Sequence, residues 1–158
     1  MKLDRTDIKI LNILQKDGRI TNAELAKRIN ISPPPTLERV KKLEKNGIIQ
    51  RYAAIVDPVT VGYQTCTFVE VTLSRHGRKN VEDFIKSVQE IDEIMECHHV
   101  TGDADFLLKI AVENIPAYEE LVFHQLTELP HIQHLKTMVV LSTFKKETAY
   151  KIKEENND

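Results

Sequence analysis

Hydrophobic residues in the first fifty positions recur at the three- and four-residue spacing of helices. The pattern predicts one helix from about Asp4, a short second helix from Thr21 and a third from Ser32 to about Asn46. All three start at residues that cap helix N-termini well, and Gly47 ends the third helix. A short helix, a tight turn and a basic helix indicate a helix-turn-helix, although a three-helix bundle with a solvated basic face fits the same pattern.

The rest of the chain alternates between strand and helix patterns after a connecting stretch that ends at Asp57-Pro58. Strands are expected at residues 65–73, 94–100, 105–112 and 135–142, and helices at residues 81–88 and from Pro116. This order predicts a ferredoxin-like βαββαβ unit, in which both helices cover one face of an antiparallel sheet. The fold class is therefore α+β, with a winged-type helix-turn-helix domain followed by the ferredoxin-like domain.

The second face of the predicted sheet is apolar. Cys66, Phe68, Leu107 and Ala111 alternate with the residues expected to face the helices. A single sheet with an apolar second face usually buries that face against another chain. The sequence therefore predicts a homodimer.

Charge is distributed unevenly along the 158 residues, although the net charge is only −2. Residues 1–56 carry twelve Lys and Arg against six Asp and Glu, whereas residues 57–158 carry ten against eighteen. A basic first third favours a nucleic-acid partner for that part of the chain. The two cysteines make no disulfide framework, and neither a signal peptide nor a membrane-spanning run is evident. We expect a soluble cytoplasmic protein without a membrane partner.

Several motifs, in order and at matching spacing, resemble the Lrp/AsnC (feast/famine) family over about residues 3–148. They are Leu3-Asp4, Asp17-Gly18-Arg19 with Thr21-Asn22, Glu24-Leu25-Ala26, Ser32-Pro33, Arg39-Val40, Gly47-Ile48-Ile49, Tyr52 with Asp57-Pro58, Thr101-Gly102-Asp103-Ala104-Asp105-Phe106, and Leu129-Pro130. The resemblance implies a transcription regulator that binds double-stranded DNA, associates with the nucleoid and senses a small effector, typically an amino acid. It also implies dimers that assemble further, to octamers, through the second domain.

The domain boundaries follow from pattern and resemblance together. We expect a helix-turn-helix DNA-binding domain at residues 1–50 and a linker strand with its connection at residues 51–64. A ligand-binding and oligomerisation domain at residues 65–148 and a polar, frayed tail at residues 149–158 complete the chain.

The third helix carries most of the predicted DNA contacts, because its inward positions leave one face free for a major groove. The predicted groove-facing residues are Pro34, Pro35, Leu37, Glu38 and Lys41, and the predicted phosphate contacts are Arg39 and Lys42. Asn22 is assigned to the DNA backbone, and Ser32 is included with helix capping as its alternative. An ion pair within the domain is the alternative for Arg39. Glu38 departs from the family, whose members often carry a basic residue nearby.

The turn around Gly102 is the predicted effector contact, with backbone N–H groups for a carboxylate and Asp103 or Asp105 for an ammonium. Ordinary turn chemistry is the alternative for both acids. The resemblance adds Thr101, Leu135 and Thr137, and Leu135 is bulkier than the small hydroxylated residue common at its position.

Other chemistries find little support. The six histidines and two cysteines lack metal-ligand spacing, and P-loop and dinucleotide fingerprints are absent, so we expect no metal, no other cofactor and no enzymatic activity. Two alternatives remain. One is an effector-independent architectural DNA-binding protein; the other is an enzyme similar to the sirohaem decarboxylases, which share this architecture.

Overall fold

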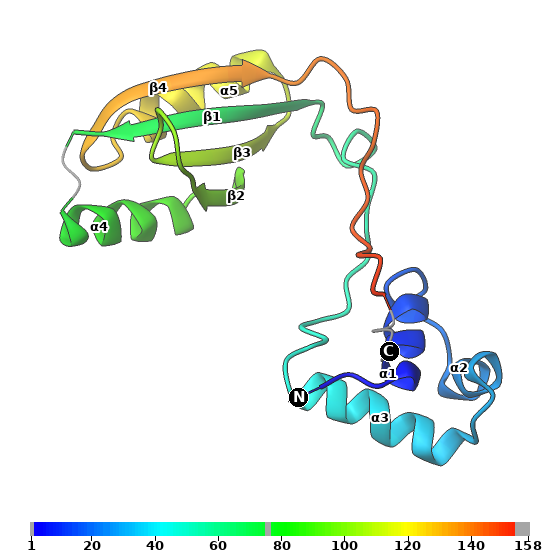
Figure 1. The fold of residues 1–158 in the computed structure, drawn as a ribbon. Helices are drawn as coiled ribbons and strands as arrows, with labels where there is room; N and C mark the ends of the chain where they lie inside the picture. Colours follow the sequence, from blue (N-terminus) through cyan, green and yellow to red (C-terminus); the bar gives the residue numbers. More distant parts are fainter. Residues whose placement is uncertain (1, 75–76, 154–158) are drawn as a thin grey trace. The chain divides into compact units, whose positions relative to one another are not determined.

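The computed structural model describes residues 2–74 and 77–153, which fold into two compact units (Figure 1). The first unit comprises the chain up to Ile55 together with the chain from Lys145 onward, and the second comprises Val56–Phe144. The chain therefore passes between the units twice, after Ile55 and after Phe144.

The first unit contains helices α1 (Arg5–Leu14), α2 (Asn22–Ile29) and α3 (Pro33–Lys45). This confirms the three predicted helices and the short connection between α2 and α3. Their apolar faces meet in a core that contains the following buried residues: Ile10, Leu11, Leu25, Ile29 and Leu43. The packing fixes the direction in which the opposite face of α3 points, which is what a DNA-reading helix requires.

The N-termini of α1 and α2 follow the predicted capping chemistry, whereas that of α3 does so only in backbone conformation. The Asp4 carboxylate accepts a hydrogen bond from the Asp7 backbone N–H at 2.8 Å, and the Asp7 carboxylate accepts one from the Asp4 N–H at 3.2 Å. Thr21 caps α2 by accepting from the Glu24 N–H at 3.2 Å. Ser32 is the N-cap of α3 by backbone conformation but makes no side-chain capping bond.

The second unit holds an antiparallel sheet in the order β2-β3-β1-β4 among the described residues. Its elements are β1 (Thr65–Leu73), α4 (Arg78–Gln89), β2 (Ile94–His99), β3 (Phe106–Val112), α5 (Ile115–Leu121), the π-helix η1 (Val122–Leu126) and β4 (Ile132–Val139). Val69 and Val71 share one buried cluster with Phe84 of α4 and Leu121 of α5, so both helices cover the same sheet face. The ferredoxin-like prediction is confirmed.

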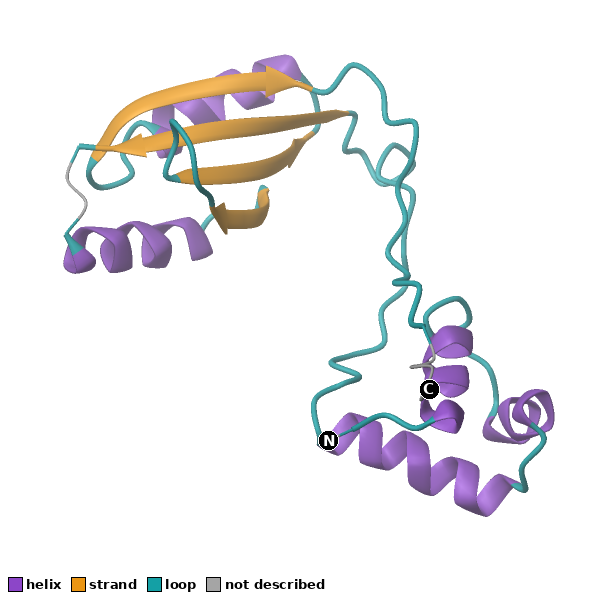
Figure 2. Cartoon of the chain, viewed as in Figure 1, coloured by secondary structure: helices purple, strands orange, loops and turns teal. Residues whose placement is uncertain are grey.

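Three local expectations were wrong. The last strand begins at Ile132 and ends at Val139, earlier than the predicted 135–142. No linker strand forms in residues 46–64, all of which are described. They are turns and extended chain (Figure 2), because no segment within residues 2–74 and 77–153 pairs with them in a ladder. Residues 149–153 do not form a frayed tail but pack on the first unit, and residues 154–158 lie outside the described residues.

Candidate nucleic-acid interface and effector site

The outward face of α3 presents most of the predicted groove contacts. Thr36 and Leu43 are fully buried and fix the orientation of the helix. The opposite positions are all exposed; they are Pro34, Pro35, Leu37, Glu38, Lys41 and Lys42. Leu37 keeps 40% of its surface exposed, which suits contact with a thymine methyl group.

Three consecutive prolines change how α3 can bind phosphate. Residues 33–35 occupy the first turn, where helices normally offer free N–H groups to an anion, but proline has no N–H. The next amide, of Thr36, is bonded to the Ser32 carbonyl at 3.3 Å. Phosphate binding along α3 therefore depends on side chains, and Lys41 and Lys42 are exposed along it.

Arg39 is held inside the first unit. One guanidinium nitrogen, Nη1, lies 2.6 Å from Asp4 Oδ2 and 2.7 Å from Asp7 Oδ1, and Asp7 is buried. These two carboxylates raise the pKa of Arg39 against the opposing effect of burial. The geometry favours the ion-pair alternative, in which Arg39 fastens α3 to the start of α1.

Asn22 and Ser32 both take part in the junction between α2 and α3. Asn22 Nδ2 donates to the Pro33 carbonyl at 2.8 Å, while Asn22 Oδ1 is buried without a hydrogen-bond partner. The Ser32 carbonyl accepts from the Thr36 hydroxyl at 3.0 Å. Both residues thus hold the start of α3 in place.

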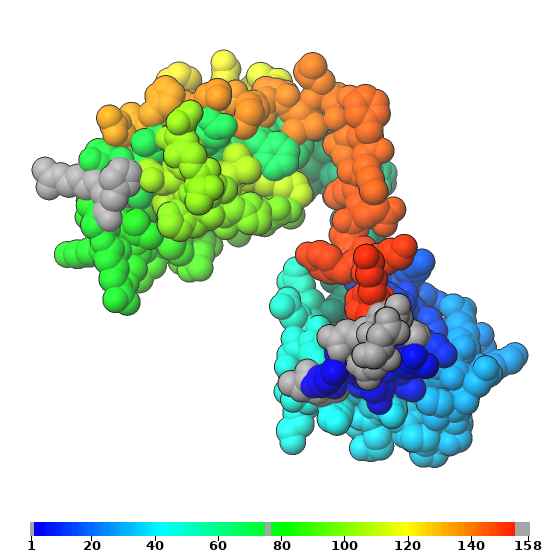
Figure 3. Space-filling model, in the orientation of Figure 1, coloured from blue at the N-terminus to red at the C-terminus, as the bar shows by residue number. Residues whose placement is uncertain are grey.

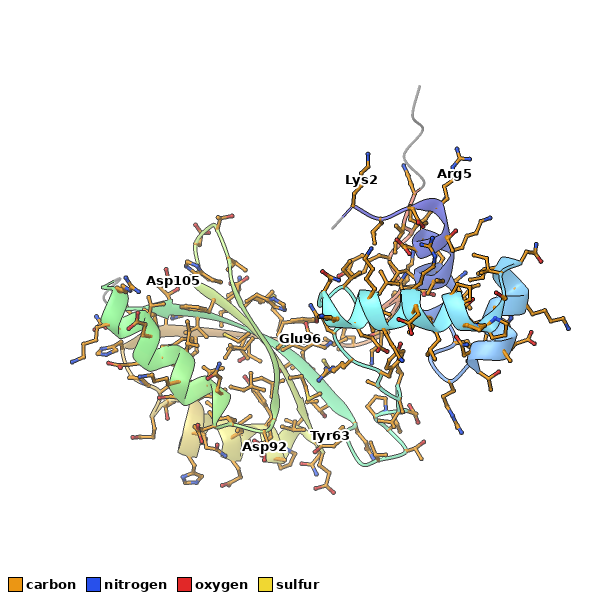
Figure 4. All side chains as sticks on the ribbon, turned by 90° about the horizontal axis from the view of Figure 1, so that it is seen from below. Lys2, Arg5, Tyr63, Asp92, Glu96 and Asp105 are labelled. Atoms are coloured by element: carbon orange, nitrogen blue, oxygen red, sulfur yellow. The ribbon has the colours of Figure 1, made fainter. Side chains whose placement is uncertain are left out.

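The turn before β3 places the predicted effector residues at one end of the sheet. Gly102 has a φ of +122°, a conformation that L side chains rarely adopt, and Thr101 and Asp103 beside it are exposed. Asp105, labelled in Figure 4, accepts from the Leu73 N–H at 2.8 Å through Oδ2. This bond to β1, thirty-two residues away, occupies one oxygen of Asp105 and is not a local turn bond, whereas Asp103 is exposed.

The two predicted residues of β4 lie on the helix-covered side of the sheet. Leu135 pairs with Val71, whose carbonyl accepts from the Asp105 N–H, so Leu135 and the Gly102 turn flank the same residue of β1. Thr137 lies further along β4, and its hydroxyl is 2.6 Å from the Tyr118 hydroxyl. The sequence analysis did not connect Tyr118 with Thr137, because no local pattern links residues nineteen positions apart.

The exposed sheet face carries charges that are paired within the chain. Glu96 of β2, labelled in Figure 4, lies 2.5 Å from Lys109 Nζ and 3.0 Å from His98 Nε2. These partners, Lys109 foremost, lower the pKa of Glu96 despite its partial burial. Across the sheet, Lys136 Nζ lies 3.1 Å from Glu70. Among the described residues, no three His, Cys, Asp or Glu side chains are arranged to hold a metal ion.

Comparison with known families agrees with both halves of this description. A winged helix-turn-helix DNA-binding family matches residues 3–50, and the Lrp/AsnC ligand binding domain matches residues 66–150. The chain is 46% identical over 151 residues to the leucine-responsive regulatory protein of Escherichia coli K12, covering 96% of this chain and 92% of that protein. The protein of the same name from Klebsiella pneumoniae matches to the same extent.

Solved structures share the fold over nearly the whole chain. A transcriptional regulator from Neisseria meningitidis, solved in complex with L-Met, has a TM-score of 0.90 and 37% identity, and the match covers 94% of this chain and 96% of that one. E. coli AsnC has a TM-score of 0.86 and 27% identity, with coverage of 94% and 98%. No helix in the described part of the chain has the length and apolar character to span a membrane. With both domain matches and these relatives, the chain belongs to the Lrp/AsnC family of transcription regulators.

Proposed function

We propose that this protein regulates transcription in the cytoplasm, at the nucleoid, by reading double-stranded DNA with the exposed face of α3. The observation that carries the proposal is a helix whose buried side is fixed by Thr36 and Leu43 while Leu37, Glu38 and Lys41 are exposed on the other side. Leu37 is assigned to a thymine methyl group and Glu38 to a cytosine amine. Lys41 is assigned to the groove beside these two residues, and Lys42 is assigned to a phosphate.

Binding to duplexes selected from a random pool tests this assignment. Lys42→Gln should weaken binding to all duplexes and reduce the slope of log affinity against log salt by about one, because one phosphate is no longer neutralised. Glu38→Gln should instead change the preferred base at one position of each half-site. Lys86→Gln, an exposed lysine of α4, is the matched control and should leave both quantities unchanged. Equal effects of Lys42→Gln and Lys86→Gln would refute the assignment.

The second unit is proposed to bind an amino-acid effector at the Gly102 turn. The exposed turn offers backbone N–H groups to a carboxylate, Asp103 offers a carboxylate to an ammonium, and Leu135 and Thr137 lie on the neighbouring part of β4. The Neisseria relative, solved with L-Met, supports an amino acid as the ligand class. We infer no other cofactor and no catalytic step.

A thermal-shift screen against the twenty amino acids tests the effector site. Ligand that binds only the folded state raises the melting temperature by mass action. Asp103→Asn should abolish the shift, whereas Asp92→Asn, away from the turn, should preserve it. If no amino acid shifts the wild type while DNA binding persists, the effector proposal fails and an architectural role replaces it.

The open sheet face is proposed to bury against a second copy of the chain. Phe68, Leu107 and Ala111 lie on this face as predicted, together with Met138, which is 39% exposed. The ion pairs Glu70–Lys136 and Glu96–Lys109 lie around this patch within each protomer, so these four charges stay paired when the face is buried. We further propose that these dimers assemble to octamers.

Sedimentation analysis tests the dimer. Phe68→Lys places a charge in the centre of the face and should yield monomers, whereas Ile85→Lys on the exposed side of α4 should not. A dimer that survives Phe68→Lys with unchanged affinity would place the interface elsewhere.

A further inference from the structure

The C-terminal residues 148–152, here called the strap, are hydrogen-bonded to α1. Gln15, the C-cap of α1, donates through Nε2 to the Tyr150 carbonyl at 3.1 Å and accepts from the Tyr150 N–H through Oε1 at 2.7 Å. One side-chain amide thus pairs with both backbone groups of Tyr150, as a neighbouring strand would. Asn12, one turn earlier, donates to the Ile152 carbonyl at 3.3 Å.

An apolar anchor accompanies these bonds. Ile152 is partly buried against the core that contains Leu11 and Leu43, whereas the Tyr150 side chain is 83% exposed. The apolar contribution of the strap to this core therefore comes from the Ile152 side chain, whereas Tyr150 is held through its backbone groups. Beside the strap lies a groove of about 500 Å³; its lining includes Leu11, Leu14, Ile48, Ile49 and Tyr52 from the body of the unit.

The contact is specific to the strap and is not a general property of the C-terminal chain. Leu141 and Phe144, just before it, are 95% and 96% exposed. Two large hydrophobic residues therefore stay in solvent while Ile152, further on, is packed. Figure 3 shows the corresponding C-terminal atoms lying against the N-terminal part of the same unit.

We propose that the face formed by α1 and residues 48–52 is a docking surface for the strap of this same chain. Docking adds Ile152 to the residues packed against the core of the first unit and attaches the second unit at two points, through residues 55–56 and residues 144–145, instead of one. A second attachment restricts the freedom of the DNA-binding unit and raises the effective concentration of each unit near the other. This gives the second unit a physical route by which to influence α3, and that consequence rests on the proposed function.

Hydrogen–deuterium exchange of the full chain tests the docking without reference to DNA. Ile152→Asp removes the anchor, and Gln15→Ala removes both bonds to Tyr150. Either change should accelerate exchange at the Tyr150 amide by roughly tenfold, since each bond is a modest net stabiliser. Gln15→Glu keeps the acceptor for the Tyr150 N–H but loses the donor, so it should have a smaller effect. Tyr150→Ala is the matched control, because its exposed side chain takes no part in these bonds, and should match the wild type.

DNA affinity is then measured on the same variants. Ile152→Asp should change affinity for a fixed duplex while Tyr150→Ala does not. The docking surface would be refuted if the Tyr150 amide of the wild type exchanged as fast as an amide in an unfolded chain. It would also be refuted if Ile152→Asp and Tyr150→Ala gave the same exchange rate at this amide. Altered exchange with unchanged affinity would overturn the route to α3. Loss of DNA binding by the wild type itself would count against the proposed function and leave the exchange result intact.

Discussion

Replacing Arg39 with alanine should destabilise the first unit far more than its half-exposed position indicates. The guanidinium contacts Asp4 and Asp7, and the Arg39 side chain keeps 34% of its surface exposed. Asp7 keeps only 5%, so the substitution leaves a carboxylate buried without its cation. Fully buried pairs lose about 3–5 kcal/mol on such a change and exposed pairs about 0.2–1 kcal/mol, which places this site near 2 kcal/mol.

Amide exchange in α1 measures this loss within the unit concerned, because a chain of two units need not unfold in one step. A loss of about 2 kcal/mol accelerates exchange by about thirtyfold. Arg28→Ala is the control: Arg28 pairs with Glu24 at 3.4 Å, and both side chains are 47% exposed, so about 0.5 kcal/mol or less is expected.

A double-mutant cycle decides whether the buried carboxylate is the cause. Asp7→Asn neutralises the group that Arg39→Ala leaves unpaired, so the double variant should be more stable than the sum of the single losses allows. Additive losses, or an Arg39→Ala effect no larger than that of Arg28→Ala, would refute the reasoning.

The cluster of Asp4, Asp7 and Arg39 also predicts how the stability of the first unit changes at low pH. Burial by itself raises the pKa of Asp4, but the Asp7 N–H and the Arg39 guanidinium outweigh it, so the pKa lies below the ordinary 3.8. The folded state therefore releases this proton at lower pH than the unfolded state, and the resulting stability is present above about pH 4 and lost as pH falls through the folded pKa. Arg39→Ala should flatten this part of the stability profile.

Three further outcomes are expected. Gly102→Val should lower the free energy of unfolding of the second unit, measured in urea, by about 1–3 kcal/mol, because a φ of +122° strains the backbone of any L residue. Steric clash adds nothing to this loss, since no atom lies within 4 Å of an added Cβ. Thr137→Val should cost about 1 kcal/mol by removing the bond to Tyr118, and chemical-shift changes should centre on α5. Burial, aided by a 2.9 Å hydrogen bond to Glu44, raises the pKa of Tyr52 from 10.0 to about 12, so stability should fall as pH rises between these values, and less steeply in Glu44→Gln.

Local patterns were sufficient for most of the fold. The capping box at Asp4 and Asp7, the start of α3 at Ser32-Pro33 and the alternation along β1 each depend on residues a few positions apart. Such signals are readable in one sequence because helix and strand periodicities are short. The prediction of a linker strand was wrong because a strand also depends on a partner that is distant in sequence. Residues 51–64 favour extended chain, but their pattern does not reveal whether such a partner exists.

Partners distant in sequence account for what was missed in the sites. The Arg39 contacts span 32 and 35 residues, and Gln15 and Tyr150 are 135 residues apart. Residues 149–158 look like a tail because charged residues dominate their composition, yet a single isoleucine among them packs into the core of the first unit. Composition averages over a segment, whereas docking depends on one side chain and three backbone groups.

The formal charge of the first third likewise overstates the number of cations that are available to bind DNA phosphates. Among the twelve cations of residues 1–56, Arg28, Arg39 and Lys41 each lie within 4.0 Å of a carboxylate of the same unit. Arg39 is the most strongly committed of these, since its two short bonds would have to break before it reached a phosphate. The prolines of α3 also remove backbone donors that would otherwise bind phosphate. Because each neutralised phosphate adds about 0.9 to the salt slope, the slope per protomer should follow the exposed lysines along α3 and fall well short of the number of basic residues.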